Sequence, residues 1–220
     1  LVIANLAPVA PAALAADILD PALREDALKF ATVMAFVDGA LDKAKIERVL
    51  DYANALGLHQ RFVGEIAEAA AGHVKQALAD MTRANIVSIT GKAWSDADAT
   101  AWLVPYDKAP DSALAERCKA LGTLPADSFG YAFYNHYRGN GYAFPGEATG
   151  LNAGFGFPHD TAHVVSGYDT TPRGELLVST FTAGMHPHFP MAGHILPVIF
   201  SWHLGIQINP VAKSAEGTLD

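Results

Sequence analysis

Cysteine is nearly absent from this chain. Cys118 is the single cysteine among 220 residues, so neither an internal disulfide nor a cysteine-based metal cluster can form. Such a composition is typical of a reducing compartment, and we expect a cytoplasmic protein. The first twenty residues carry no lysine or arginine and are interrupted by Pro8 and Pro11, which argues against a signal peptide. Leu1 in place of methionine leaves room for a segment upstream.

Clustered positive charge is absent as well. The chain has 15 Lys and Arg residues against 23 Asp and Glu, a formal net charge of -8, and its basic residues are scattered. No basic stripe can hold a phosphate backbone, so we expect no nucleic-acid partner. The sequence also lacks a phosphate loop, a dinucleotide fingerprint and a serine or cysteine nucleophile motif, which argues against the enzyme classes that depend on them.

Long apolar runs are missing too. The most apolar stretch, residues 194–208, is interrupted by Pro197 and His203 and is shorter than the ~20 residues that span a bilayer. It predicts a buried helix and no transmembrane segment, with contact at a membrane surface as the alternative. Because 50% of the residues are hydrophobic, the chain can bury a sizeable core as one large or two small domains.

Helical periodicity dominates what is present. Between Pro21 and Lys92 apolar residues recur at helical spacing, which predicts a helical hairpin followed by one or two more helices. Asp42 is the predicted N-cap of the second helix, and Gly57 its predicted end. The apolar positions of three predicted helices are Leu23, Ala27, Phe30 and Met34; Ile46, Val49, Leu50 and Ala53; and Phe62, Ile66 and Val74.

Further helices are predicted in the second half, so the expected fold class is all-α. They cover residues 95–103, a segment from Asp111 or Ser112 to 121, and an aromatic-rich segment that follows Asp127 or Ser128.

Two segments without apolar periodicity separate these helices. Residues 105–111 hold prolines and aspartates and form the best linker candidate. We therefore predict a helical N-terminal domain over residues 1–105 and a helical metal-binding domain over residues 106–220, packed against the first or linked to it. The glycine-rich residues 138–158 predict a long loop, of a kind often used for binding.

A pair of histidines four residues apart follows that loop. Residues 157–167 are typical of a helix that begins at Pro158 and ends at Gly167. On such a helix His159 and His163 lie on one face, so both imidazoles can reach one metal ion. A pair with this spacing also occurs by chance without a ligand, and that alternative stays open at this point.

Two carboxylates accompany the histidines. Asp160 lies about 100° round the helix from His159 and can either bind the metal or orient an imidazole. Glu175 follows a short turn at the start of the next helical stretch, so the chain can fold it back over His163. Imidazole and carboxylate ligands together favour zinc, Zn2+, with Fe2+, Mn2+ and Mg2+ as alternatives.

The spacing of these four residues resembles a known signature. The pattern His159-Asp160-x-x-His163, followed by eleven residues and Glu175, is similar to that of the ubiquinone (coenzyme Q) biosynthesis protein 4 family. The resemblance covers roughly residues 112–207. It implies an all-helical fold, a zinc-type site made by the four residues, and a long apolar cavity for an isoprenoid tail.

The same resemblance implies a role in quinone biosynthesis. The protein would be either a scaffold for other biosynthetic enzymes or the catalyst that oxidatively removes a carboxylate from the prenylated ring. The segment Asn152–Pro158 departs from the family pattern, because it is glycine-rich and uncharged where a basic, helical approach is expected.

The N-terminal residues resemble a different family, the TerB (tellurite resistance) helical fold. That resemblance rests on Ala31-Thr-Val-Met-Ala-Phe-Val-Asp38-Gly39 and on Leu56-Gly57-Leu58, and it implies an Asp-Gly turn between two helices. Asp38, Asp42 and Glu47 are too few for an EF-hand-like loop, so we expect a solvated turn. A plain helical bundle is the alternative.

These patterns lead to a functional hypothesis. We predict a metal-dependent enzyme that acts on a hydrophobic aromatic or prenylated acid, with Asp160 and His186 as the catalytic residues that move protons. The expected pocket is lined by phenylalanines, namely Phe129, Phe133, Phe155, Phe157 and Phe181.

Alternatives remain at this point. His186 is equally consistent with a surface or hydrogen-bonded core histidine. A non-catalytic lipid-binding scaffold with a structural metal, and an enzyme of another secondary-metabolite pathway, are the other two functional hypotheses. The expected partners are an aromatic or isoprenoid small molecule, other biosynthetic enzymes, and a second copy of the chain in a homodimer.

Overall fold

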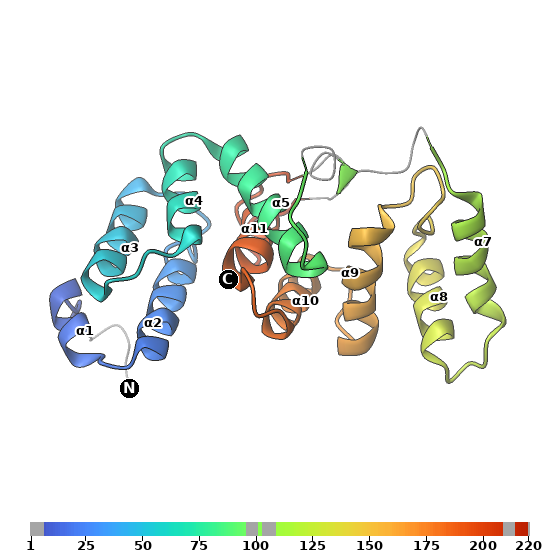
Figure 1. The fold of residues 1–220 in the computed structure, drawn as a ribbon, viewed down its shortest axis with the longest axis horizontal. Helices are drawn as coiled ribbons and strands as arrows, with labels where there is room; N and C mark the ends of the chain where they lie inside the picture. Colours follow the sequence, from blue (N-terminus) through green and yellow to red (C-terminus); the bar gives the residue numbers. More distant parts are fainter. Residues whose placement is uncertain (1–6, 96–100, 103–108, 209–213, 220) are drawn as a thin grey trace. The chain divides into compact units, whose positions relative to one another are not determined.

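The described part of the chain is entirely helical (Figure 1). The computed structural model describes residues 7–95, 101–102, 109–208 and 214–219. Within these ranges the chain forms ten α-helices and no strand beyond one isolated bridge between Leu204 and Glu216. The predicted all-α class is therefore confirmed.

Two compact units make up the chain. The first extends to Ala77 and the second runs from Leu78 to Leu219, so the division falls inside α5 (Val74–Thr90). The sequence placed its domain boundary later, at residues 105/106. Most of that predicted linker, and most of the helix predicted over 95–103, lie outside the described residues, so these domain assignments stay predictions.

The first unit is built around α3. Its helices are α1 (Pro11–Asp17), α2 (Pro21–Met34), α3 (Lys43–Leu56) and α4 (Arg61–Ala70), and α3 contacts each of the other three. Asp42 caps α3 and Gly57 ends it at a φ of 70°, as predicted. The core consists of apolar side chains from all these helices except α1, among them Leu28, Phe36, Ile46, Val49, Ala53, Leu56, Phe62 and Ile66.

The face of α2 that points into this core is not the predicted one. Leu23, Phe30 and Met34 are 58%, 73% and 62% exposed, whereas Leu28 and Thr32 are buried. Thr32 can take a core position because its hydroxyl donates to the Leu28 carbonyl oxygen at 2.8 Å. A pattern of apolar residues alone could not reveal that a threonine belongs to the buried face.

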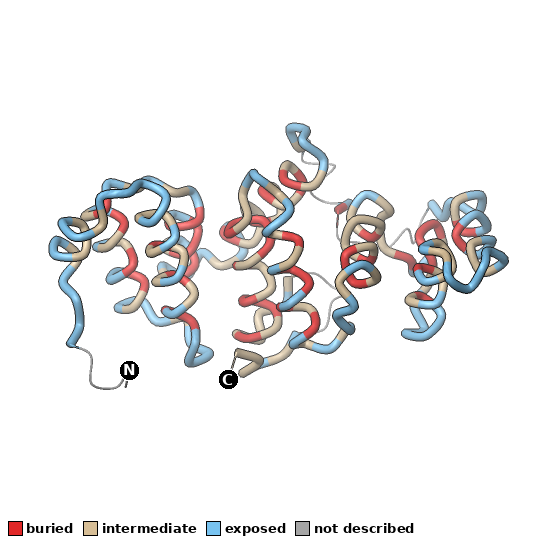
Figure 2. The backbone as a smooth tube through the Cα atoms, turned by 90° about the horizontal axis from the view of Figure 1, so that it is seen from below, coloured by how far each residue is buried: buried red, intermediate tan, exposed pale blue. Residues whose placement is uncertain are grey.

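The second unit is built around α10 (Pro172–Met185), which contacts α9 (Ala153–Ser166), η3 (Pro190–Ile195, one turn of π-helix) and α11 (Leu196–Trp202). α8 (Phe129–Asn140) packs on α9, and η2 (Leu121–Thr123) packs on α8 and α7 (Ser112–Ala120). Figure 2 shows buried positions recurring along these helices.

The loop predicted over residues 138–158 is wrong in its second part. α9 begins at Ala153, capped by Asn152, and Pro158 lies inside the helix rather than at its start. At Gly154 another group comes too close for a larger residue, because a Cβ there would lie 2.9 Å from the ring of Trp102. A Cβ on Gly156 would make only an ordinary contact, 3.5 Å from the Tyr137 hydroxyl.

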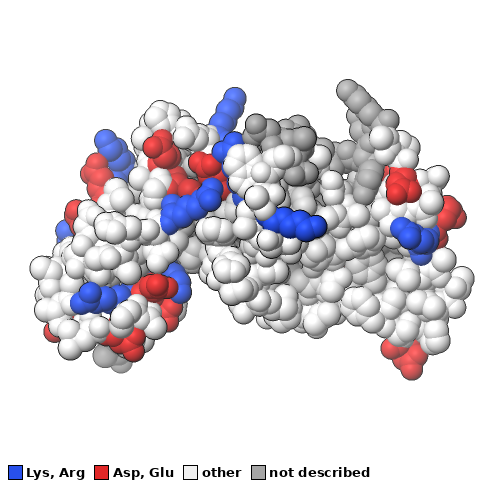
Figure 3. Space-filling view, viewed as in Figure 1, with Lys and Arg blue, Asp and Glu red and all other residues white. Residues whose placement is uncertain are grey.

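Charge is unevenly distributed along the chain. Residues 176–212 contain no Asp, Glu, Lys or Arg, and on the face drawn in Figure 3 the surface around α9 and α10 is largely uncharged. No described helix combines the length and the apolar character needed to cross a bilayer.

The cap of α3 gives a test of the first unit. Asp42→Ala removes the carboxylate that accepts hydrogen bonds from the backbone N–H groups of Ala44 at 2.7 Å and Lys45 at 3.2 Å. We expect the free energy of unfolding, measured by denaturation and far-UV circular dichroism, to fall by about 1 kcal/mol. Asp51→Ala, at an exposed position inside the same helix, is the control, and equal losses in both variants would contradict the capping role.

Candidate metal centre

Two imidazoles of α9 converge on one point. His159 and His163 lie one helical turn apart, with ring centroids 4.8 Å apart and their Nε2 atoms 3.3 Å apart. Gly167 ends the helix at a φ of 74° and lets the chain turn back, so that His163 Nδ1 lies 2.9 Å from the Tyr168 carbonyl oxygen. A carbonyl can only accept, so Nδ1 carries the proton and the lone pair of His163 lies on Nε2, where a metal would bind.

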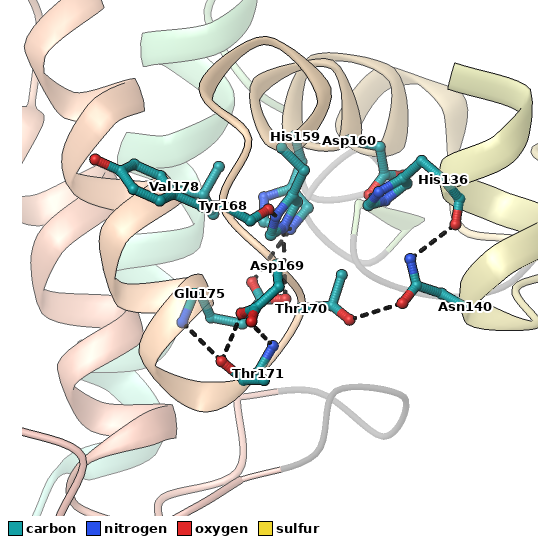
Figure 4. A network of polar contacts seen from close by, with 12 residues as sticks. His136, Asn140, His159, Asp160, Tyr168, Asp169, Thr170, Thr171, Glu175 and Val178 are labelled. Carbon is teal, nitrogen blue, oxygen red and sulfur yellow. Dashed lines mark hydrogen bonds and ion pairs between the residues drawn. The ribbon is translucent and has the colours of Figure 1, made fainter. Parts of the chain in front are cut away.

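Glu175 closes this group from the next helix. Thr171 caps α10 by accepting from the Gly174 N–H at 3.1 Å, which places Glu175 in the first turn. Its two carboxylate oxygens lie 3.3 Å from His159 Nε2 and 3.5 Å from His163 Nε2 (Figure 4). The predicted turn therefore does fold Glu175 back over the histidines.

The charges in this group depend on one another. Burial raises the pKa of the Glu175 carboxyl, but hydrogen bonds to His159 and His163 outweigh it and lower the pKa to about 2. Burial lowers the pKa of His159, but the hydrogen bond to Glu175 and the charges of Glu175 and Asp160 raise it above its usual value. Without a metal, a proton on His159 provides the positive charge that Glu175 needs.

Asp160 lies beside this group and is held by α8. The Tyr137 hydroxyl donates a hydrogen bond to Asp160 Oδ2, and His136 Nε2 lies 3.4 Å from Oδ1. Burial, followed by the charge of Asp160, raises the pKa of Tyr137, so the phenol keeps its proton. Asp160, His159 and His163 offer ligand atoms that all lie within 4.8 Å of one another.

All four predicted metal residues are thus brought together, in two overlapping sets. One set is His159, Asp160 and His163, which offer one ligand atom each within 4.8 Å of one another. In the other, the two imidazoles lie 3.3 Å apart, and the two oxygens of Glu175 lie 3.3 Å from His159 and 3.5 Å from His163.

Aromatic rings support the imidazoles on either side. Phe155 stacks on His159 at 5.1 Å, and His136 stacks on His163 at 5.3 Å. Figure 4 shows the loop before α10 beside the ligands, with Thr170 bonded to Asn140 of α8. These contacts fix the ring orientations before any ion is bound, which raises the affinity of a site.

A cavity of about 580 Å3 extends from the metal group into the second unit. The four predicted metal residues lie in its wall. Further along, the wall consists of side chains of α5, α10, η3 and α11, including Met81, Asn85, Ser179, Thr182, His194 and Trp202. The wall contains no lysine or arginine among the described residues, so its formal charges are those of Asp160 and Glu175.

The predicted pocket lining is mostly wrong. Of the five phenylalanines, Phe155 lines the cavity. Phe133 and Phe157 pack instead in a separate core cluster with Cys118 and Tyr137, and Phe129 is 51% exposed. On α8, Phe133 packs in the cluster that holds Cys118 of α7 and lies 5.8 Å from the ring of Phe157 of α9, and the order of aromatic residues in the sequence does not show this.

The predicted catalytic residues differ in position. Asp160 lines the cavity, whereas His186 does not and stacks on His194 with ring centroids 5.0 Å apart. A catalytic role of either residue stays a prediction. The sequence analysis missed Tyr137 as the partner of Asp160 and gave no role to His194. The run of uncharged residues that surrounds His194 was the available signal for a buried histidine.

Comparison with known proteins identifies no relative of this chain. No protein-family model, no curated protein and no solved structure matches the chain. The two family resemblances stay predictions.

The turn before α10 gives the first test of the site. A Cβ on Gly174 would collide with the backbone and carboxylate oxygens of Asp169, which belongs to the same turn as the Tyr168 carbonyl that orients His163. We expect Gly174→Ala to weaken zinc binding at least about tenfold, measured by competition with a chromophoric chelator.

Gly184→Ala is the matched control for that variant. Gly184 lies in the same helix, and a Cβ there has no heavy atom within 4 Å, so we expect unchanged zinc affinity. If the two alanine variants bind zinc alike, the turn does not hold the site.

His194 gives a second test, through the pH dependence of stability. Burial, then the charges of His186 and His159, lower its pKa from 6.5 to about 4. The folded state therefore holds this imidazole neutral while the unfolded chain protonates it, so this contribution to stability is complete above pH 6.5 and is lost as the pH falls to about 4. The total loss is at most about 3 kcal/mol.

Tryptophan fluorescence can measure this effect in the metal-free protein, because Trp94, Trp102 and Trp202 all lie in the second unit. We expect His194→Gln to flatten the decline of the free energy of unfolding between these pH values. Parallel pH profiles of the variant and the parent would show that His194 is not the group responsible.

Proposed function

We propose that His159, His163 and Glu175 bind zinc. Around an ion held at about 2.0–2.1 Å, tetrahedral ligand atoms are about 3.3–3.4 Å apart, whereas octahedral neighbours at that bond length are about 2.9 Å apart. The Nε2 atoms of His159 and His163 are 3.3 Å apart, which matches the tetrahedral spacing, and each lies within 3.5 Å of a different oxygen of the Glu175 carboxylate. Two imidazoles in the set also favour zinc over magnesium or manganese.

We propose further that the cavity binds a hydrophobic aromatic acid. The observation that carries this proposal is a cavity of about 580 Å3 whose described wall has two carboxylates and no lysine or arginine. An acid entering such a space needs a positive charge, and the zinc group is the one place where the wall can supply it. An aromatic or prenylated ring suits the apolar remainder of the wall.

The reaction that we propose, following the resemblance to the ubiquinone biosynthesis protein 4 family, is oxidative removal of the ring carboxylate: the bond between ring and carboxylate breaks, carbon dioxide leaves, a hydroxyl group from water takes its place, and dioxygen accepts the two electrons. Zinc, when bound, attracts and polarises a ligand oxygen. Asp160 lines the same cavity, with Tyr137 at its Oδ2 and His136 at 3.4 Å from its Oδ1, and would move a proton to or from the ligand.

A lipid-binding scaffold with a structural metal is the second candidate. The position of Asp160 favours this candidate, since Asp160 offers a ligand atom within 4.8 Å of those of both histidines. With Glu175 it would complete four protein ligands and leave no position for a substrate.

Metal analysis of the purified protein tests the zinc site. We expect His163→Ala and Glu175→Ala each to weaken zinc binding by more than about a hundredfold, measured by mass spectrometry of metal content and by chelator competition. His188→Ala, which removes an exposed imidazole elsewhere in the second unit, should bind zinc as the parent does. Zinc retained in both site variants would refute the assignment.

The same preparations separate the two candidate functions. An aromatic carboxylate such as 2-naphthoate should bind the zinc-loaded protein at least about tenfold more tightly than the metal-free protein if the metal receives the acid. Equal affinity with and without zinc would favour the scaffold, in which the metal only joins α9 to α10.

A further inference from the structure

The turn η3, which contributes Gly193 and His194 to the wall of the cavity, is held in an unusual conformation. Phe189, which precedes it, has a φ of 54°, the one positive φ among the described residues that are not glycine. The turn itself is π-helical, a form that recurs at functional sites. Backbone strain of this kind persists only where surrounding contacts enforce it.

α5 provides those contacts. Asn85 donates from Nδ2 to the Gly193 carbonyl oxygen at 2.8 Å and accepts from Trp102 Nε1 at 2.7 Å. Gly193 packs so closely on α5 that a Cβ would lie 3.1 Å from the backbone of Ala84 and Asn85. The turn is therefore fixed to α5, and His194 has little freedom to move.

The protonation of His194 follows from its neighbour Ser88. Ser88 Oγ lies 2.7 Å from the His188 carbonyl oxygen and 2.8 Å from His194 Nε2. The carbonyl has no hydrogen, so the single hydroxyl proton of Ser88 goes to it; otherwise two lone pairs would face each other at 2.7 Å. Ser88 must then accept from His194, which places the imidazole proton on Nε2.

The other ring nitrogen of His194 is left as an acceptor. Nδ1 has no hydrogen-bond partner among the described residues, although the residue is only 5% exposed, and His194 belongs to the wall of the cavity. Nδ1 is not among the fully buried polar atoms that lack a partner, so its lone pair is open to the cavity, where a ligand or a water molecule can satisfy it. Ser88 itself is excluded as a nucleophile, because its proton is already donated to a backbone carbonyl.

We propose that His194 Nδ1 accepts a hydrogen bond from a hydroxyl group of the bound ligand, so that the cavity selects ring compounds that carry a phenolic or quinol hydroxyl. This proposal rests on the proposed function in that the same cavity holds the ligand, but the contact itself does not require the metal. Ser179 and Thr182, which lie on the cavity side of α10 beyond Glu175, add hydroxyl groups to the same wall.

A matched pair of probes tests this contact in the metal-free protein. 2-Naphthol can donate a hydrogen bond and 2-methoxynaphthalene cannot, while their rings are the same. We expect 2-naphthol to bind about tenfold more tightly, measured by fluorescence titration, and we expect this ratio to fall to about one in His194→Phe. His194→Gln, which keeps both a donor for Ser88 and an acceptor for the ligand, should retain part of the preference.

A second measurement does not depend on a variant that folds. Nitrogen NMR of the imidazoles in the parent protein should show His194 protonated at Nε2, with Nδ1 shifting when 2-naphthol binds and not when 2-methoxynaphthalene binds. A proton on Nδ1, no binding of 2-naphthol, or the same preference in His194→Phe would each overturn the proposal. These titrations contain no zinc. A parent protein that does not bind zinc would therefore refute the proposed metal site and leave the results of the titrations unchanged.

Discussion

The contact between Glu175 and the two imidazoles of α9 is the constraint on which the second unit depends. A carboxylate buried between helices is costly unless positive charge and hydrogen bonds compensate it, and here His159 and His163 are the groups within 3.5 Å. A proton or a metal ion must therefore sit between α9 and α10. If the proposed site binds a cation, the packing of α9 on α10 and the binding of that cation are coupled.

Local chemistry made much of the fold predictable. Asp42, Gly57 and Gly167 mark helix ends because their effect requires only neighbouring residues, and the spacing of His159 and His163 gave the metal face for the same reason. The failures involve distant partners. Pro158 and the glycines before it were predicted to lie in a loop, whereas they belong to α9. The prediction failed because the side chains beside these glycines, Trp102 and Tyr137, come from other parts of the sequence.

The residues that form the wall of the cavity could not be predicted from the sequence, for a related reason. Ser88 and His194 are 106 residues apart, and nothing in either segment indicates that they meet. Their contact decides which nitrogen of His194 carries the proton, and so decides what the cavity can recognise. In the proposed function, the metal group supplies charge to the cavity and His194 of η3 supplies a neutral acceptor.

The placement of the ligands on two successive helices has a consequence for assembly. His159 and Glu175 are only 16 positions apart, and the turn between α9 and α10 is short, so this helical hairpin has the low contact order that favours rapid formation. The contacts between α5 and η3 must form later, since they join residues 106 and 108 positions apart. During synthesis the hairpin that carries the candidate metal ligands can therefore form before these contacts close the cavity.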